Sequence, residues 1–261
     1  MPDTVLRLVR EGGVARVTLD RPDVRNAFNA ELIAALRETF VALATEENVR
    51  AVVLDGAGKT FCGGADVNWM RASLDLSEDE NVRDAEGLSD MYRAIDQCPK
   101  PVIGRIHGGA LGGGAGLAAV CDIVVTTPET LYGFTETKLG IIPAVISPFV
   151  LAKIGLSHAR ALFLTGERFS AERAQRIGLV HEIAPAHGID GRVADIVREL
   201  GTAGPRAVAA AKALVPQVRA ASYDDSRTLT ARAIARQRTT DEGQEGLRAF
   251  LERRAARWTE R

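Results

Sequence analysis

The chain has 261 residues, of which 46% are hydrophobic and 26% are charged, as in an ordinary globular protein. Its formal net charge is −1, and it contains only 8 Phe, 3 Tyr and 2 Trp. It therefore has neither the basic field nor the stacking surface that hold a nucleic-acid backbone, and nucleic acid is not an expected partner.

Predicted strands and helices alternate along the first two thirds of the chain. Short runs rich in Val, Leu and Ile predict strands, and apolar residues repeating every 3.6 residues predict helices. In chain order the expected strands are 5–9, 14–19, 49–54, 102–106 and 121–126, and the expected helices are 29–44, 77–97, 156–164 and 171–177. The first two strands form a hairpin around Gly12-Gly13, and the later ones suit a buried, partly parallel sheet. This alternation predicts the α/β class.

The last part of the chain has a different pattern. From residue 203 onward it is rich in Ala and Arg and contains no Val or Ile run long enough for a strand. We therefore expect a core over residues 1–200, which holds the functional site, and a helical C-terminal region over residues 201–261.

Cysteine and histidine spacing gives no sign of a structural metal or a disulfide framework. Cys62, Cys98 and Cys121 occur in no CxxC pair, and the four histidines have no ligand spacing, so we expect no metal and a reducing compartment. The first residues lack a signal-peptide pattern, and no apolar stretch is long enough to span a membrane. These features predict a cytoplasmic protein without a membrane partner.

Glycine is the one residue type in excess, and ten of the 25 glycines gather in residues 56–64 and 108–116. Each cluster follows a predicted buried strand. Glycine lets a ligand approach bare backbone, so free N–H groups from both clusters could point at one atom. Two such donors at a carbonyl oxygen form an oxyanion hole. For any single glycine, a tight turn or close packing of a helix on a strand is the competing interpretation.

The motifs around these glycines resemble, in order and over nearly the whole chain, the enoyl-CoA hydratase/isomerase (crotonase) family. The segments that carry the resemblance include Arg21-Pro22, Asn26-Ala27-Phe28, Phe61-Cys62-Gly63-Gly64-Ala65-Asp66, His107-Gly108-Gly109-Ala110-Leu111-Gly112-Gly113-Gly114, and Glu136-Thr137-Lys138-Leu139-Gly140. The resemblance implies a spiral of ββα units with a helical C-terminus that packs between subunits, as homotrimers or dimers of trimers.

The resemblance also assigns roles to residues. The backbone N–H groups of Ala65 and Gly113 would form the oxyanion hole for an acyl-CoA thioester. Coenzyme A is part of the substrate, and no separate metal or redox cofactor is implied. The residues expected along the CoA moiety are Val24, Arg25, Ala27, Asp66 and Val67, with Lys59 near its phosphates and Phe250 and Arg253 reaching the CoA of a neighbouring subunit. For the three cations, an ordinary solvated surface charge is the competing interpretation.

Hydration of a 2-enoyl thioester needs a base for water and an acid for C2, and hydratases of this family usually place two glutamates there. Here Gly116 occupies the position of the first, while Glu136 occupies that of the second. An apolar pocket would raise the pKa of Glu136 and let it act as base and then acid.

Three functions remain open on these residues. The first is a hydratase in which Glu136 works alone, and the second is a double-bond isomerase in which Glu136 moves a proton between C2 and C4. The third is a catalytically weak acyl-CoA-binding subunit. The motifs around residues 67–70, 112–117 and 139–148 resemble the bacterial methylglutaconyl-CoA hydratase type, which favours hydration and suggests methylglutaconyl-CoA as a substrate. Arg71 or Lys138 would then meet the second carboxylate of that substrate.

Overall fold

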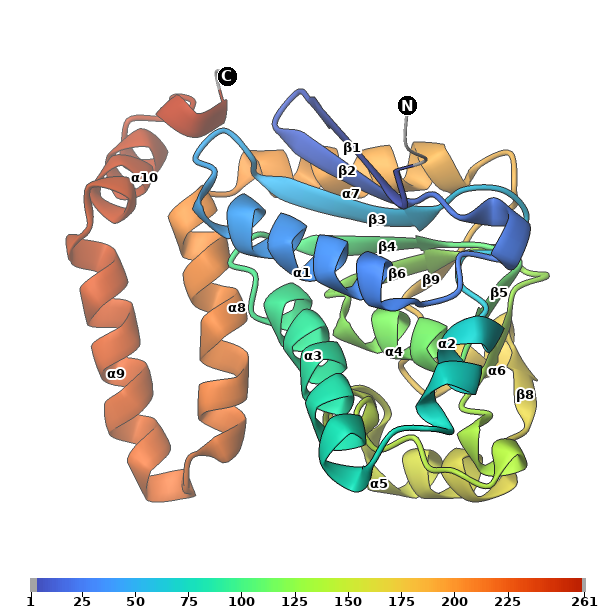
Figure 1. Cartoon of the computed structure of the whole chain (residues 1–261). Helices are drawn as coiled ribbons and strands as arrows, with labels where there is room; N and C mark the ends of the chain where they lie inside the picture. The colour runs from blue at the N-terminus through green and yellow to red at the C-terminus, as the bar shows by residue number, and fades with distance from the viewer. Residues whose placement is uncertain (1–3, 260–261) are drawn as a thin grey trace.

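A six-stranded sheet forms the centre of the molecule (Figure 1). The computed structural model describes residues 4–259, so the N-terminal residues 1–3, part of the signal-peptide prediction, and residues 260–261 lie outside it. The sheet order is β1-β2-β3-β4-β6-β9, and only the β1–β2 hairpin is antiparallel. The strand bounds are β1 Leu6–Glu11, β2 Val14–Leu19, β3 Ala51–Gly56, β4 Val102–Ile106, β6 Ile123–Thr126 and β9 Glu182–Ile183. The predicted hairpin and the partly parallel sheet are confirmed.

Helices cover both faces of this sheet, which explains the continuous apolar runs in its strands (Figure 1). Val53, Ile103 and Val125 point to one face and pack against α7 (Ile189–Thr202). Their neighbours in sequence point to the other face, where α1 (Ala30–Thr45), α3 (Glu78–Asp96) and α4 (Gly113–Val120) lie. The caps explain where two of the predicted helices begin, because Asn29 caps α1 and Ser77 forms a capping box with Glu80 in α3.

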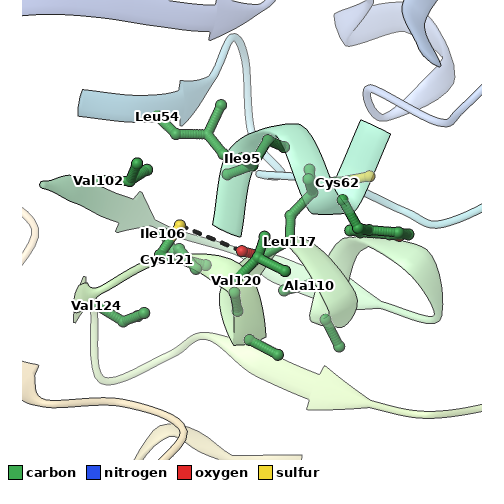
Figure 2. Packing of buried hydrophobic residues seen from close by; sticks show 14 of the residues in the cluster. Leu54, Cys62, Ile95, Val102, Ile106, Ala110, Leu117, Val120, Cys121 and Val124 are labelled. Atoms are coloured by element: carbon green, nitrogen blue, oxygen red, sulfur yellow. Dashed lines mark hydrogen bonds between the residues drawn. The ribbon is translucent and has the colours of Figure 1, made fainter. Parts of the chain in front are cut away.

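The short helix α4 is packed inside the core beside β4 and β6. Figure 2 shows Leu117 and Val120 of this helix among Leu54, Ile106 and Val124. The Cys121 thiol donates a hydrogen bond to the Leu117 carbonyl oxygen at 3.2 Å. Burial raises the pKa of the Cys62 and Cys121 thiols to about 12, so both behave as small core residues, as expected.

A second, three-stranded sheet lies beyond α4, with the order β5-β7-β8. Its strands are β5 Gly109–Leu111, β7 Leu131–Gly133 and β8 Arg168–Ser170. None of them was predicted, because three residues are too few to show an alternating pattern. The remaining helices of the core are α2 Val67–Ser73, α5 Ser147–Thr165 and α6 Ala171–Arg176, with the 3₁₀ turns η1 Pro22–Val24 and η2 Glu136–Leu139.

The C-terminal region is helical, as predicted, and extends beside the core (Figure 1). It contains α8 Pro205–Ala220, α9 Tyr223–Thr239, α10 Asp241–Leu251 and the turn η3 Arg257–Thr259. The expected division between residues 200 and 201 falls in the last turn of α7. Lys212 of α8 joins the two parts, because its ammonium group lies 2.6 Å from the Asp122 carboxylate. Between residues 4 and 259 no helix has the length and apolar content needed to cross a bilayer.

Candidate active site

The two glycine clusters meet at the carboxyl ends of β3 and β4. These strands are parallel neighbours, so the segments that follow them emerge at the same edge of the sheet. The Cys62 N–H donates to the Gly109 carbonyl at 3.0 Å, and the Leu111 N–H donates to the Cys62 carbonyl at 3.1 Å. Gly64 has a φ of +97°, and a Cβ there would lie 2.9 Å from the Leu111 carbonyl oxygen. The close approach of the two segments therefore requires glycine at this position.

Two backbone N–H groups at this junction are free. Phe28 pairs with the residues on either side of Ala65, which turns the Ala65 N–H away from that contact. Gly113 is the first residue of α4, where helix geometry leaves the N–H without an internal acceptor. Within residues 4–259 neither N–H donates a hydrogen bond. The second glycine cluster is therefore only partly the loop we expected, because its last three glycines form the start of α4.

The Glu136 carboxylate lies over the same junction. One of its oxygens, Oε1, is 3.5 Å from the point where a Cβ on Gly112 would be. The other, Oε2, is buried and has no hydrogen-bond partner among the described residues. Burial raises the pKa of Glu136, because the charged form loses hydration and gains no cation in return. A cavity of about 700 Å³ is lined by Ala65, Gly112, Gly113 and Glu136 together with apolar side chains.

The packing around Gly116 leaves no space for a glutamate side chain at this position. A Cβ on Gly116 would collide with the Cγ2 of Ile146 and lie 2.9 Å from the Tyr92 hydroxyl. Tyr92 is fully buried, and its hydroxyl donates a 2.7 Å hydrogen bond to the Gly113 carbonyl. Burial raises the Tyr92 pKa well above its ordinary value, and the neighbouring Glu136 carboxylate adds to the shift. Sequence reasoning missed Tyr92, because nothing in the pattern of α3 distinguishes it from other buried aromatic residues.

Comparison with known proteins identifies the fold and the family. Residues 9–261 match the enoyl-CoA hydratase/isomerase family. The chain belongs to this family. It is 34% identical to an enoyl-CoA hydratase of Shewanella pealeana, with a TM-score of 0.95 over 98% of this chain and 97% of that one. It is also 34% identical to AtuE of Pseudomonas aeruginosa, with a TM-score of 0.94 over 98% and 99% of the two chains. An enoyl-CoA hydratase of Alternaria alternata is 35% identical over 222 residues, which are 83% of this chain and 71% of that protein.

This membership confirms the expected crotonase fold and shows an enzyme of the crotonase family. Four of the residues expected near CoA are exposed at the surface. Val24 and Arg25 lie in and just after η1, and the Gly63 N–H donates to the Arg25 carbonyl at 2.8 Å. Lys59 and Val67 are also exposed.

Two other expected CoA contacts point into the protein. Ala27 is buried, its N–H donates to the Val24 carbonyl at 3.2 Å, and its carbonyl accepts from the Arg21 guanidinium. The Asp66 carboxylate caps α2 through the Asn68 N–H and forms a 2.9 Å salt bridge with Arg21. The backbone N–H of Asp66 donates to the Phe28 carbonyl at 2.8 Å, and its carbonyl accepts from the Met70 N–H at 2.9 Å.

The remaining expected residues lie away from the cavity. Phe250 is in the last turn of α10, and Arg253 follows this helix. Figure 1 shows α10 on the opposite side of the molecule from α2, so neither residue reaches the cavity of its own chain. The Arg71 guanidinium reaches the Asn68 side chain at 3.4 Å, and the Lys138 side chain lies against Gly166. Neither Arg71 nor Lys138 lines the cavity.

Proposed function

We propose that this protein is an enoyl-CoA hydratase, which adds water across the 2,3 double bond of an enoyl-CoA thioester. One observation carries the proposal: half-buried Glu136, whose Oε2 atom has no hydrogen-bond partner among the described residues, shares a cavity with the two free N–H groups of Ala65 and Gly113. The N–H groups suit a thioester oxygen that gains negative charge. A carboxylate whose pKa is raised suits a group that must both accept and return a proton.

In the proposed reaction, the Glu136 carboxylate takes a proton from water as the water oxygen bonds to C3. The electrons of the double bond move toward the thioester, and the resulting enolate oxygen accepts hydrogen bonds from Ala65 and Gly113. Protonated Glu136 then returns the proton to C2, and the thioester carbonyl is restored. The net change is the addition of one water molecule, and Glu136 ends in its starting state.

For the CoA portion, we propose contacts with the edge formed by Val24, Arg25, Lys59 and Val67. All four are exposed beside the glycine-rich segment, as a solvent-facing ligand requires. Phe250 and Arg253 would approach the CoA of a neighbouring subunit in a homotrimer or a dimer of trimers. Phe250 and its neighbour Leu251 are both largely exposed, at 82% and 78%, and such a pair supports a role in contacting another molecule.

A second candidate function is a double-bond isomerase. It is favoured by the packing around Gly116, where Tyr92 and Ile146 fill the space of a second carboxylate. One carboxylate suffices to carry a proton between C2 and C4, and no water is consumed. A subunit that binds acyl-CoA without converting it is less favoured, because Glu136 is present and lines the same cavity as Ala65 and Gly113.

The test is to incubate the purified protein with crotonyl-CoA and with a 3-enoyl-CoA and to identify the products. A hydratase converts crotonyl-CoA to the 3-hydroxyacyl thioester, whereas an isomerase shifts the double bond of the 3-enoyl thioester. Glu136→Gln is expected to lower kcat by about 10²- to 10⁴-fold, because it removes the acid/base group. Binding of butyryl-CoA by this variant is the control for an intact site, and full activity of Glu136→Gln would contradict the proposal.

Among enoyl thioesters, methylglutaconyl-CoA is the candidate that the motif resemblance suggests. It carries a second carboxylate at the far end of its acyl chain. A site for that carboxylate would need a cation or several hydrogen-bond donors at the corresponding end of the cavity.

A further inference from the structure

The wall of the cavity away from the glycines is formed by α2, α3 and the segment after Glu136. Its members are mainly apolar, and they include Trp69 and Met70 of α2, Leu88 of α3, and Ile141, Ile142 and Val145. Such a wall suits a hydrocarbon chain. The polar side chains in the same wall are Ser73, Asn81 and Asp84.

Asp84 gives this wall a negative charge. The indole N–H of Trp69 donates to Asp84 Oδ1 at 3.3 Å, which orients the carboxylate. Among the described residues, Asp84 forms no salt bridge, and the lining of the cavity contains no Lys, Arg or His. The cavity thus holds two carboxylates, Asp84 and Glu136, and no cation.

We infer that the cavity accepts enoyl chains without charge and rejects chains that end in a carboxylate, with Asp84 as the discriminating residue. This inference rests on the proposed function, since it concerns the acyl part of the same thioester site. A third carboxylate would lose hydration on entering an apolar wall and would find a like charge in place of a partner. The cations nearest in sequence, Arg71 and Lys138, are directed to Asn68 and Gly166 and offer no compensation. This inference predicts that methylglutaconyl-CoA, the candidate that the motif resemblance suggests, binds poorly because its acyl chain ends in a carboxylate.

The test compares two saturated ligands that differ at the chain end, butyryl-CoA and glutaryl-CoA, by calorimetric titration of the full-length protein. We expect butyryl-CoA to bind at least about tenfold more tightly, because like-charge contacts are strongly discriminating when partly desolvated. Asp84→Asn should reduce the difference in affinity between butyryl-CoA and glutaryl-CoA. Asp84→Arg should make glutaryl-CoA the tighter ligand. Asp90→Arg is the matched control, because Asp90 is an exposed residue of the same helix outside the cavity lining, and it should leave the preference unchanged.

Equal affinity of the wild type for the two ligands, or the same preference in Asp84→Arg as in the wild type, would overturn the inference. A stronger preference for butyryl-CoA in Arg71→Ala or Lys138→Ala than in the wild type would show that a cation compensates the chain carboxylate, and it would also contradict the inference. The failure of the proposed function gives a different result. If butyryl-CoA binds preferentially but crotonyl-CoA is not hydrated, the hydratase proposal fails and the inference about chain charge stands. If no acyl-CoA binds, both fail.

Discussion

The surroundings of the Glu136 carboxylate distinguish it from an ordinary surface glutamate. This carboxylate lies beside Gly112 at the glycine-rich junction, and its buried oxygen Oε2 has no donor among residues 4–259. The motif resemblance selected Glu136, Ala65 and Gly113 from the sequence, and the structure places all three on one cavity. Their catalytic roles remain predictions. Tyr92 could not be predicted, since its position beside Gly113 depends on how α3 packs against α4.

The raised pKa of Glu136 predicts the pH dependence of hydration. Below this pKa Glu136 is protonated and cannot accept a proton from water, so kcat/KM should fall as the pH decreases through it. Because burial raises the pKa, this fall should be centred above about 4.3, the ordinary value for glutamate. The measurement is a pH profile of kcat/KM with crotonyl-CoA, with butyryl-CoA binding over the same range as the control. A fall centred at or below the ordinary value would contradict the prediction.

The Tyr92 hydroxyl is expected to support the start of α4. Tyr92→Phe removes its hydrogen bond to the Gly113 carbonyl and should cost about 0.5–1.5 kcal/mol in the free energy of unfolding. It should also lower kcat several-fold, because Gly113 supplies one of the proposed oxyanion donors. Both are measured, by urea denaturation and by steady-state kinetics.

Tyr132→Phe is the control for this experiment. Tyr132 is also fully buried and donates a 2.8 Å hydrogen bond, but its acceptor is Thr126, and Tyr132 does not line the cavity. Tyr132→Phe should lower the free energy of unfolding by a similar amount and leave kcat unchanged. An equal loss of kcat in both variants would show that Tyr92 acts through general stability alone.

Among the helices and strands, the sequence predicts the long ones and those with a clear hydrophobic period. The β1–β2 hairpin and the helices α1 and α3 have clear periods and caps, and each was expected within a few residues of its observed bounds. The helix α4 was not expected, because seven of its eight residues are buried on all sides and it shows no polar face. The glycine cluster predicts a loop, whereas in the structure Gly113, Gly114 and Gly116 begin α4 and allow it to pack closely in the core.

The packing of α4 predicts a specific coupling between Gly116 and Ile146. Gly116→Ala should reduce the free energy of unfolding by about 1–3 kcal/mol, because its methyl group would collide with Ile146. Ile146→Ala removes the obstructing Cγ2, so Gly116→Ala should cost less in that background, by about 1 kcal/mol or more. Urea denaturation of the two single variants and the double variant measures this coupling.

Gly87→Ala in α3 is the matched control for the substitution, because no atom of residues 4–259 lies within 4 Å of a Cβ there. It should raise stability by up to about 1 kcal/mol through helix propensity alone. Additive effects of Gly116→Ala and Ile146→Ala would contradict the packing account of the missing carboxylate.

At the scale of the whole molecule, we propose that the C-terminal helices contact another subunit. The region is joined to the core through Lys212 and Asp122, and it carries Phe250 and Leu251 at 82% and 78% exposure on the side away from the cavity. Single exposed apolar residues are common, but two large neighbours at the end of one helix favour an interface. The sequence predicted helices here from composition, whereas their placement relative to the core depends on contacts distant in the chain.

If Phe250 and Arg253 contact the CoA of a neighbouring subunit, a complete site draws Glu136 from one chain and Phe250 from another. The Phe250→Ala/Arg253→Gln double variant should then show about a tenfold rise in KM for crotonyl-CoA, and Glu136→Gln should be inactive. Co-expressing the two variants in equal amounts should restore about a quarter of the sites in a trimer, because each such site needs one chain of each kind in a fixed order. Kinetics of the purified mixture at low crotonyl-CoA, beside each variant alone, measures this recovery. Activity no greater than the average of the separate variants would show that each chain builds its site without its neighbour.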